Sequence, residues 1–182
     1  VNEKLASALA KLVEPGDIIW VHDYHLIPLA RYLRAAGIAN RLGFFLHIPF
    51  APASFVATLP VAREMLNDLT HYDVAGFQTE GFARDFRDGA ARWLDAAVDG
   101  EHVRHAGRTT RVIAAPIGID AAPFERDAIR AARSAEAERL LSSLHGRALA
   151  IGVDRLDYSK GLPNRFEGYA RLLARHPEHL QK

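Results

Sequence analysis

Short apolar runs recur along this chain at intervals of roughly thirty residues, and a stretch with helical periodicity follows each of them. Each run is too short for a helix and ends near polar residues, as buried strands of a parallel sheet do. The runs occupy residues 17–22, 42–47, 74–78, 111–115 and 148–153. Trp20, Phe44 and Phe45 lie inside them, and we expect these aromatic residues in the core.

Helices are expected around and between these runs. They are placed at residues 2–13, 26–36, 61–69, 79–95 and 128–144, with another that begins at Leu162. Strands that alternate with helices predict repeated βαβ units. The expected fold class is therefore α/β, with parallel sheets flanked by helices.

Residues 116–123 interrupt this alternation. Two prolines and a glycine gather there, and such residues mark loops between structured segments. We expect residues 1–117 to be the later part of one Rossmann-like domain and residues 118–182 to be the start of a second, both incomplete. The chain begins with a valine and no further strand follows its last helix, so we expect a piece from the middle of a longer protein.

Composition narrows the class of protein. The 182 residues carry 23 basic and 22 acidic side chains with no basic block, so we expect no nucleic-acid partner. The chain has no cysteine, which fits a cytoplasmic enzyme without disulfides. Residues 42–62 are uncharged over a length that could span a membrane, but one glycine and three prolines interrupt them. We expect a strand, a loop and a short helix capped by Ser54 there, and no membrane contact.

Two cations mark the loop before the helix at Leu162. Arg155 offers a rigid fork of donors and Lys160 a point charge, and this combination suits a phosphate or diphosphate. Gly161 and the first N–H groups of the helix would add backbone donors, in the crevice where parallel sheets bind ligands. The same residues also fit a solvated loop with two surface cations.

A second group of polar residues follows the first strands. His22, Asp23 and His25 come at the end of the first strand, and His47 ends the next one. Imidazoles and carboxylates cluster in this way at metal sites, but they also bind sugar hydroxyls or their own loops. Gln78 ends the third strand and could face the same cleft. We favour a sugar pocket without metal or cofactor, and the other two interpretations stay open.

Four motifs stand in order along the chain. They are Val-His-Asp-Tyr-His (21–25), Phe-Phe-Leu-His-Ile-Pro-Phe (44–50), Gly-Phe-Gln-Thr-Glu (76–80) and Arg-Leu-Asp-Tyr-Ser-Lys-Gly (155–161). Over nearly the whole chain they resemble the trehalose-6-phosphate synthase family, glycosyltransferase family 20, which has retaining enzymes of two Rossmann-like domains, the GT-B fold. The resemblance implies transfer of glucose from a nucleotide-glucose, with UDP-glucose the expected donor, to glucose 6-phosphate, which gives trehalose 6-phosphate.

The resemblance also implies roles for individual residues. Arg155 and Lys160 match the family's donor-phosphate residues and would neutralise the leaving nucleoside diphosphate. His47 matches a histidine that contacts the donor glucose, and it completes the expected catalytic and donor-binding set. Asp23 matches the acceptor-binding aspartate. Three further residues are expected to shape the pocket, namely His22, Pro49 and Gln78.

Other functions stay open on the sequence. One is a GT-B glycosyltransferase with a different acceptor, and another is a non-catalytic homologue that binds a nucleotide sugar. A third is a metal-dependent phosphohydrolase that uses His22, Asp23, His25 and His47. The sequence does not decide between a uridine and a guanosine donor, and it is compatible with a homo-oligomer. The family has further acceptor and donor loops outside this stretch, so we expect the stretch alone to be inactive.

Overall fold

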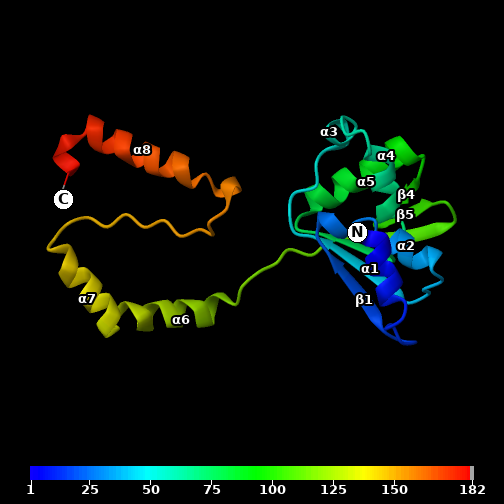
Figure 1. Cartoon of the computed structure of the whole chain (residues 1–182), viewed down its shortest axis with the longest axis horizontal. Coiled ribbons are helices and arrows are strands. Elements are labelled where there is room, and N and C mark those ends of the chain that lie inside the picture. Colours follow the sequence, from blue (N-terminus) through cyan, green and yellow to red (C-terminus); the bar gives the residue numbers. More distant parts are fainter. Residues whose placement is uncertain (181–182) are drawn as a thin grey trace. The chain divides into compact units, whose positions relative to one another are not determined.

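The computed structural model describes residues 1–180 and separates into two compact units, Val1–Gly118 and Ile119–Lys182. Figure 1 follows their elements along the chain. None of the helices within residues 1–180 is long and apolar enough to cross a membrane. The sheet described below belongs to the first unit.

The first unit is built on a six-stranded sheet with the strand order β1-β2-β3-β6-β5-β4. The strands are β1 (Ile18–His22), β2 (Arg41–Leu46), β3 (Val74–Phe77), β4 (Ala97–Asp99), β5 (His102–His105) and β6 (Arg108–Ala114). β1, β2, β3 and β6 run parallel, whereas β5 and β4 continue the sheet as antiparallel strands. The α/β class with a mainly parallel sheet is therefore confirmed.

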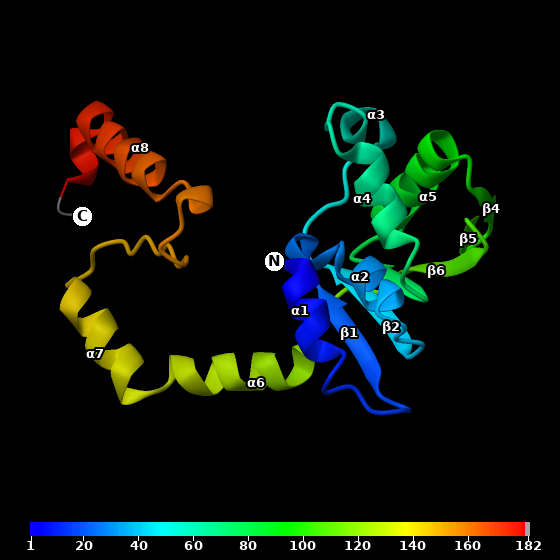
Figure 2. The same ribbon diagram turned by 45° about the vertical axis from the view of Figure 1, so that its right-hand side comes forward.

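One helix precedes the first strand, and the others connect the parallel strands (Figure 2). They are α1 (Asn2–Leu9), the short 3-10 helix η1 (Tyr24–Leu26), α2 (Leu29–Ala35), α3 (Ala53–Val56), α4 (Ala62–Leu69) and α5 (Glu80–Leu94). The connections from β1 to β2, β3 and β6 all step in one direction across the sheet. Right-handed crossovers then place α2, α4 and α5 on the same face, and the contacts of α4 with both α2 and α5 agree with this.

Alternate strand residues point towards these helices and form the core. Leu42, Phe44 and Leu46 of β2 are each at most 3% exposed, and Phe77 of β3 and Val112 of β6 are fully buried. The helices contribute their own apolar side chains to the same cluster. The burial of this single apolar layer is what fixes the register of the parallel strands.

The opposite face of the sheet is more open. Ile18 and Trp20 of the edge strand β1 are 69% and 66% exposed, so the expectation that Trp20 lies in the core is wrong. The expectation is confirmed for Phe44 and Phe45, which are 2% and 8% exposed. A continuous apolar run predicts burial on both faces, but little of the described chain covers this face of β1.

A local signal explains where α5 begins. The Thr79 hydroxyl accepts a hydrogen bond from the Phe82 N–H at 3.2 Å, so it caps α5, and Asp95 ends that helix in the left-handed conformation. The helix expected at 79–95 is thereby confirmed. The expected cap at Ser54 is wrong, because α3 begins directly after Pro52 and its N-cap makes no side-chain hydrogen bond.

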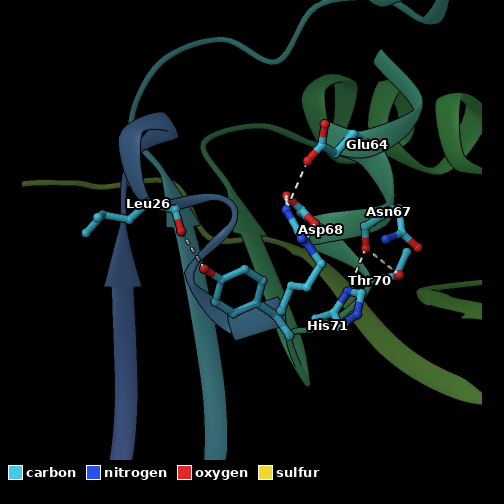
Figure 3. A network of polar contacts seen from close by, with 8 residues as sticks. Leu26, Glu64, Asn67, Asp68, Thr70 and His71 are labelled. Atoms are coloured by element: carbon cyan, nitrogen blue, oxygen red, sulfur yellow. Dashed lines mark hydrogen bonds and ion pairs between the residues drawn. The ribbon is translucent and has the colours of Figure 1, made fainter. Parts of the chain in front are cut away.

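A polar network joins helix α2 to helix α4 (Figure 3). The buried Asp68 carboxylate accepts from Arg31 Nε at 2.5 Å, and Arg31 also pairs with the exposed Glu64 at 2.9 Å. Burial raises the pKa of Asp68, and the Arg31 guanidinium opposes that effect. Nearby, the hydroxyl of Tyr72 donates to the Leu26 carbonyl at 2.8 Å, which ties the start of β3 to the turn after β1.

The second unit holds α6 (Ala121–Ala132), α7 (Ala135–Leu144), the 3-10 helix η2 (Tyr158–Lys160), α8 (Leu162–Arg175) and the 3-10 helix η3 (Pro177–His179). The single helix expected at 128–144 is wrong, since two helices meet at Ser134. The Ser134 hydroxyl accepts from the Ala137 N–H at 3.2 Å and starts a new helix there. The helix expected at Leu162 is confirmed, with a proline in its first turn.

The strand expected at 148–153 is not formed in the described chain. The segment is extended, but it pairs with no strand within residues 1–180. Its apolar side chains and those of α8 line an open hollow of about 620 Å³. Ile151 and Val153 are 72% and 86% exposed. A parallel strand exists only as part of a ladder, so the sequence pattern alone could not produce it.

Candidate active site

The carboxyl ends of β1, β2 and β3 lie next to one another at one edge of the sheet, and each delivers a residue expected in the site. Asp23 follows β1, His47 follows β2 and Gln78 follows β3. Strand ends at such an edge form the crevice in which open parallel sheets bind ligands. The strand order places these three residues at the same edge of the sheet.

Asp23 has a strained backbone. Its φ of 69° and ψ of 160° lie where side chains other than glycine are rare. Two contacts across to β2 hold it there: its N–H donates to the Phe45 carbonyl at 2.9 Å, and its Oδ1 accepts from the His47 N–H at 3.3 Å. Strain of this kind is concentrated at functional sites. It sets the carboxylate of Asp23 against the loop that carries His47.

His22 and His47 form a pair. His22 Nδ1 lies 2.9 Å from His47 Nε2, and the rings stack with centroids 5.2 Å apart. The hydrogen bond requires one of these nitrogens to carry a proton and the other to be free of it, so protonation of both would break the contact. His22 therefore orients the His47 ring, and the contact couples the proton positions of the two imidazoles.

Aromatic rings support this pair from the open face of the sheet. The Trp20 ring lies 4.5 Å from the ring of His22, and the Phe45 ring lies 4.9 Å from that of His47. The sequence prediction missed Trp20 as part of the site. The signal was available, because Trp20 and His22 are two residues apart on one strand and so share a face.

Glycine at position 76 leaves room for this arrangement. A Cβ placed on Gly76 would lie 2.8 Å from Cδ2 of Phe45, inside van der Waals contact. Position 76 of β3 is paired with position 45 of β2 in the sheet. The glycine thus lets the Phe45 ring lie flat against the neighbouring strand, beneath His47.

A buried aromatic ring fixes the loop after β2, and a side-chain hydrogen bond fixes the loop after β3. Pro49 is exposed, but the next residue, Phe50, is buried against the rings of Phe77 and Phe86 at 5.5 and 5.7 Å. Gln78 Oε1 accepts from the Ile117 N–H at 3.0 Å. The structure therefore gives Gln78 a contact to the segment after β6, which orders that segment beside the site.

The four residues considered as metal ligands do not gather as such. His25 stacks on Tyr24 with ring centroids 3.8 Å apart. Within residues 1–180, His22, Asp23, His25 and His47 do not bring three ligand atoms within 4.8 Å of one another. The short contact between His22 and His47 is a hydrogen bond, so the geometry does not favour the phosphohydrolase alternative.

The cationic loop belongs to the second unit. The Asp157 carboxylate accepts from the Ser159 N–H at 2.9 Å, and this hydrogen bond, with the charges of Arg155 and Lys160, holds the pKa of Asp157 below its usual range. Arg155 and Lys160 are exposed and make no ion pair within residues 1–180. Gly161 has a φ of 61°, which glycine adopts without strain, and it leads directly into α8.

The loop is thus ordered by Asp157 and leaves its two cations open. Asp154, just before them, pairs with Arg165 of α8 instead. Two cations without an ion pair in the described part of the chain, placed before the N-terminus of a 14-residue helix, can bind an anion such as a phosphate. The structure therefore brings Asp23, His22 and His47 together in the first unit, and Arg155 and Lys160 together in the second.

The first unit has the class of a Rossmann-like α/β domain, with polar side chains at the carboxyl ends of its parallel strands, where such sheets bind ligands. A family model described as "Glycosyltransferase family 20" matches residues 1–182. The chain belongs to this family.

Named relatives agree with the family. A trehalose-6-phosphate synthase of Sinorhizobium fredii is 44% identical over 178 residues, which cover 97% of this chain and 38% of the relative. The protein of Yarrowia lipolytica named "Alpha,alpha-trehalose-phosphate synthase [UDP-forming]" is 37% identical, and the match covers 100% of this chain and 40% of that relative. The chain thus spans about two fifths of the length of these curated relatives.

Solved structures are similar as well. The UDP-forming alpha,alpha-trehalose-phosphate synthase of Burkholderia xenovorans in complex with glucose-6-phosphate has a TM-score of 0.83 and 41% identity, over 100% of this chain and 41% of that one. A structure described as "Trehalose-6-phosphate from E. coli bound with UDP-2-fluoro glucose" has a TM-score of 0.80 and 37% identity. The match covers 98% of this chain and 40% of that one.

Proposed function

We propose that the protein containing this chain transfers glucose from a nucleotide-glucose to glucose 6-phosphate and forms trehalose 6-phosphate. UDP-glucose is the expected donor. The observation that carries the proposal is the family match over residues 1–182. Relatives named trehalose-6-phosphate synthase and a similar structure in complex with glucose-6-phosphate supply the substrates. The two units would be parts of the two Rossmann-like domains of a GT-B enzyme, divided near residues 117 and 118.

In this proposal residues of the first unit bind the acceptor sugar and the glucose of the donor. Asp23 binds a hydroxyl of the acceptor, because the rigid contacts to β2 leave its second carboxylate oxygen without a partner within residues 1–180. His47 contacts the donor glucose, and His22 acts on it as a positioning residue through the 2.9 Å hydrogen bond. Pro49 and Gln78 shape the walls of the pocket.

The second unit would bind the donor phosphates. Arg155 and Lys160 stabilise the negative charge that develops on the leaving nucleoside diphosphate as the bond to the anomeric carbon breaks. Such catalysis needs neither a protein nucleophile nor a metal. In a front-face reaction with retention, a phosphate oxygen of the leaving group takes the proton from the acceptor hydroxyl.

Product analysis with the full-length protein tests the function. The purified enzyme is incubated with UDP-glucose or GDP-glucose and glucose 6-phosphate, and the product is identified by NMR. We expect trehalose 6-phosphate, with the uridine donor preferred. A different acceptor that reacts faster than glucose 6-phosphate would favour the other GT-B function, and no transfer from either donor would overturn the proposal.

Two variants separate the sugar roles. Asp23→Asn keeps the shape of the side chain and should raise KM for glucose 6-phosphate more than KM for the donor. His47→Gln should instead impair use of the donor. His102→Gln, at an exposed position on β5, is the matched control and should leave both unchanged. A cytoplasmic location and a homo-oligomer stay predictions, which cell fractionation and light scattering would check.

A further inference from the structure

The segment directly after α8 carries three metal-ligating side chains within four residues, none of which is among the residues proposed for catalysis. Nδ1 of His176 lies 3.1 Å from Oε1 of Glu178, and Nε2 of His179 lies 4.0 Å from the same oxygen. All three ligand atoms fall within 4.8 Å of one another. The side chains are 51%, 56% and 58% exposed, so an ion from solution can reach them.

The backbone explains why these side chains converge. Residues 177–179 form the 3-10 helix η3, with hydrogen bonds from the His179 N–H to the His176 carbonyl and from the Leu180 N–H to the Pro177 carbonyl, both 3.0 Å. The single turn brings the rings of His176 and His179 to a centroid distance of 5.9 Å. Pro177 fixes φ at the first position of this turn. The ligands are therefore gathered by the fold before any ion binds.

We propose that His176, Glu178 and His179 form a site for one zinc ion or a similar transition-metal dication. Ligand atoms at zinc distances of about 2.0–2.2 Å lie roughly 3.4 Å apart in a tetrahedral site, and the two distances to Glu178 Oε1 here, 3.1 and 4.0 Å, lie on either side of that value. Two imidazole nitrogens and one carboxylate oxygen select zinc, nickel, copper or cobalt over magnesium and calcium. Three protein ligands leave the fourth position to water.

The surroundings favour a cation at this place. The site lies just past the C-terminus of α8, where the carbonyl groups of the last turn carry partial negative charge. Arg175 in that turn is a nearby positive charge that opposes binding. A bound ion would fasten η3 to the end of α8, so its role is structural and independent of the proposed glucosyl transfer.

Equilibrium dialysis of the full-length protein against zinc chloride tests the site. We expect one zinc ion bound at micromolar concentration, and at least tenfold weaker binding in both His179→Ala and Glu178→Gln. His102→Ala, which removes an exposed histidine elsewhere, is the control and should bind like the wild type. Arg175→Gln should bind more tightly, because it removes the opposing charge.

Cobalt absorption and enzyme activity complete the test. Cobalt bound by these ligands should give visible bands that His179→Ala loses, while glucosyl transfer by that variant stays unchanged. Zinc binding that is equal in His179→Ala and the wild type, or that appears only at millimolar zinc, would overturn the proposal. Loss of zinc in His47→Gln but not in His179→Ala would also overturn it and place the metal in the active site.

Discussion

The ion pair between α2 and α4 yields a prediction about which of its partners depends more on the other. Asp68 is 1% exposed, whereas Arg31 is 32% exposed and has Glu64 as a second partner at 2.9 Å. Removing the arginine leaves the buried carboxylate of Asp68 without its ion-pair partner. Removing the aspartate leaves the arginine with Glu64 and water. We therefore expect Arg31→Met to destabilise the protein more than Asp68→Ala.

The magnitudes follow from these surroundings. A buried charge left without its partner costs about 3–5 kcal/mol, which we expect for Arg31→Met. Asp68→Ala loses charge-assisted hydrogen bonds, worth about 1.5–3 kcal/mol. Glu64→Gln affects only a largely exposed pair and should cost at most about 1 kcal/mol. The double variant Arg31→Met with Asp68→Leu should recover much of the loss, because no buried charge remains.

Urea unfolding of the full-length protein measures these differences as shifts in midpoint at constant slope. A pH signature should accompany them. In Arg31→Met the folded state binds a proton at Asp68 more readily than the unfolded state does. The loss of unfolding free energy relative to the wild type should therefore shrink as the pH falls from 7.5 to 5.5. An Asp68→Ala loss as large as that of Arg31→Met, or a deficit unchanged at pH 5.5, would refute the reasoning.

Three further predictions concern other parts of the molecule. Arg155→Ala and Lys160→Ala should each lower kcat/KM by roughly ten- to several-hundredfold with little change in Tm, because each loses a charge-assisted contact to the donor diphosphate; steady-state kinetics with varied donor check this, and unchanged values in both variants would contradict the phosphate role. Gly76→Ala pushes a Cβ to within 2.8 Å of Phe45 and should cost about 1–3 kcal/mol in thermal unfolding, together with weaker donor use. Burial lowers the pKa of His71 from 6.5, so the folded state binds fewer protons than the unfolded state between the two pKa values, and stability should fall as the pH drops through that window; His71→Gln should flatten this dependence in unfolding midpoints measured from pH 7.5 to 5.

The sequence predicted the elements whose signals are local. The helix at 79–95 has a capping threonine and a clear apolar stripe, and it was found with nearly correct ends. The strand at 148–153 failed because its existence depends on a partner that no local pattern specifies. The helix at 128–144 failed for the opposite reason: the apolar periodicity runs on across Ser134, while a single hydroxyl starts a new helix there.

The proximity of three candidate site residues was predictable from the sequence, but their geometry was not. That His22, Asp23 and His47 meet follows from strand ends at one edge of a parallel sheet. Their contacts depend on register: His22 pairs with Phe45, so His47, two residues further along, stands on the same face. The positive φ of Asp23 had no signal in the sequence, because aspartate adopts many other conformations at strand ends.

The order of the strands has a consequence for how the protein is made. β1, β2 and β3 are neighbours in the sheet in the order in which the ribosome produces them, at about 5–20 residues per second. β2 and β3 can therefore each pair with a strand that already exists. β6 is different, because β4 and β5 are synthesised before it and have no other place in the sheet. Until residue 114 has left the ribosome, the edge of β3 is open and the hairpin of β4 and β5 has no strand to join. A ribosome that pauses before β6 would therefore hold a chain that chaperones and proteases recognise as unfinished.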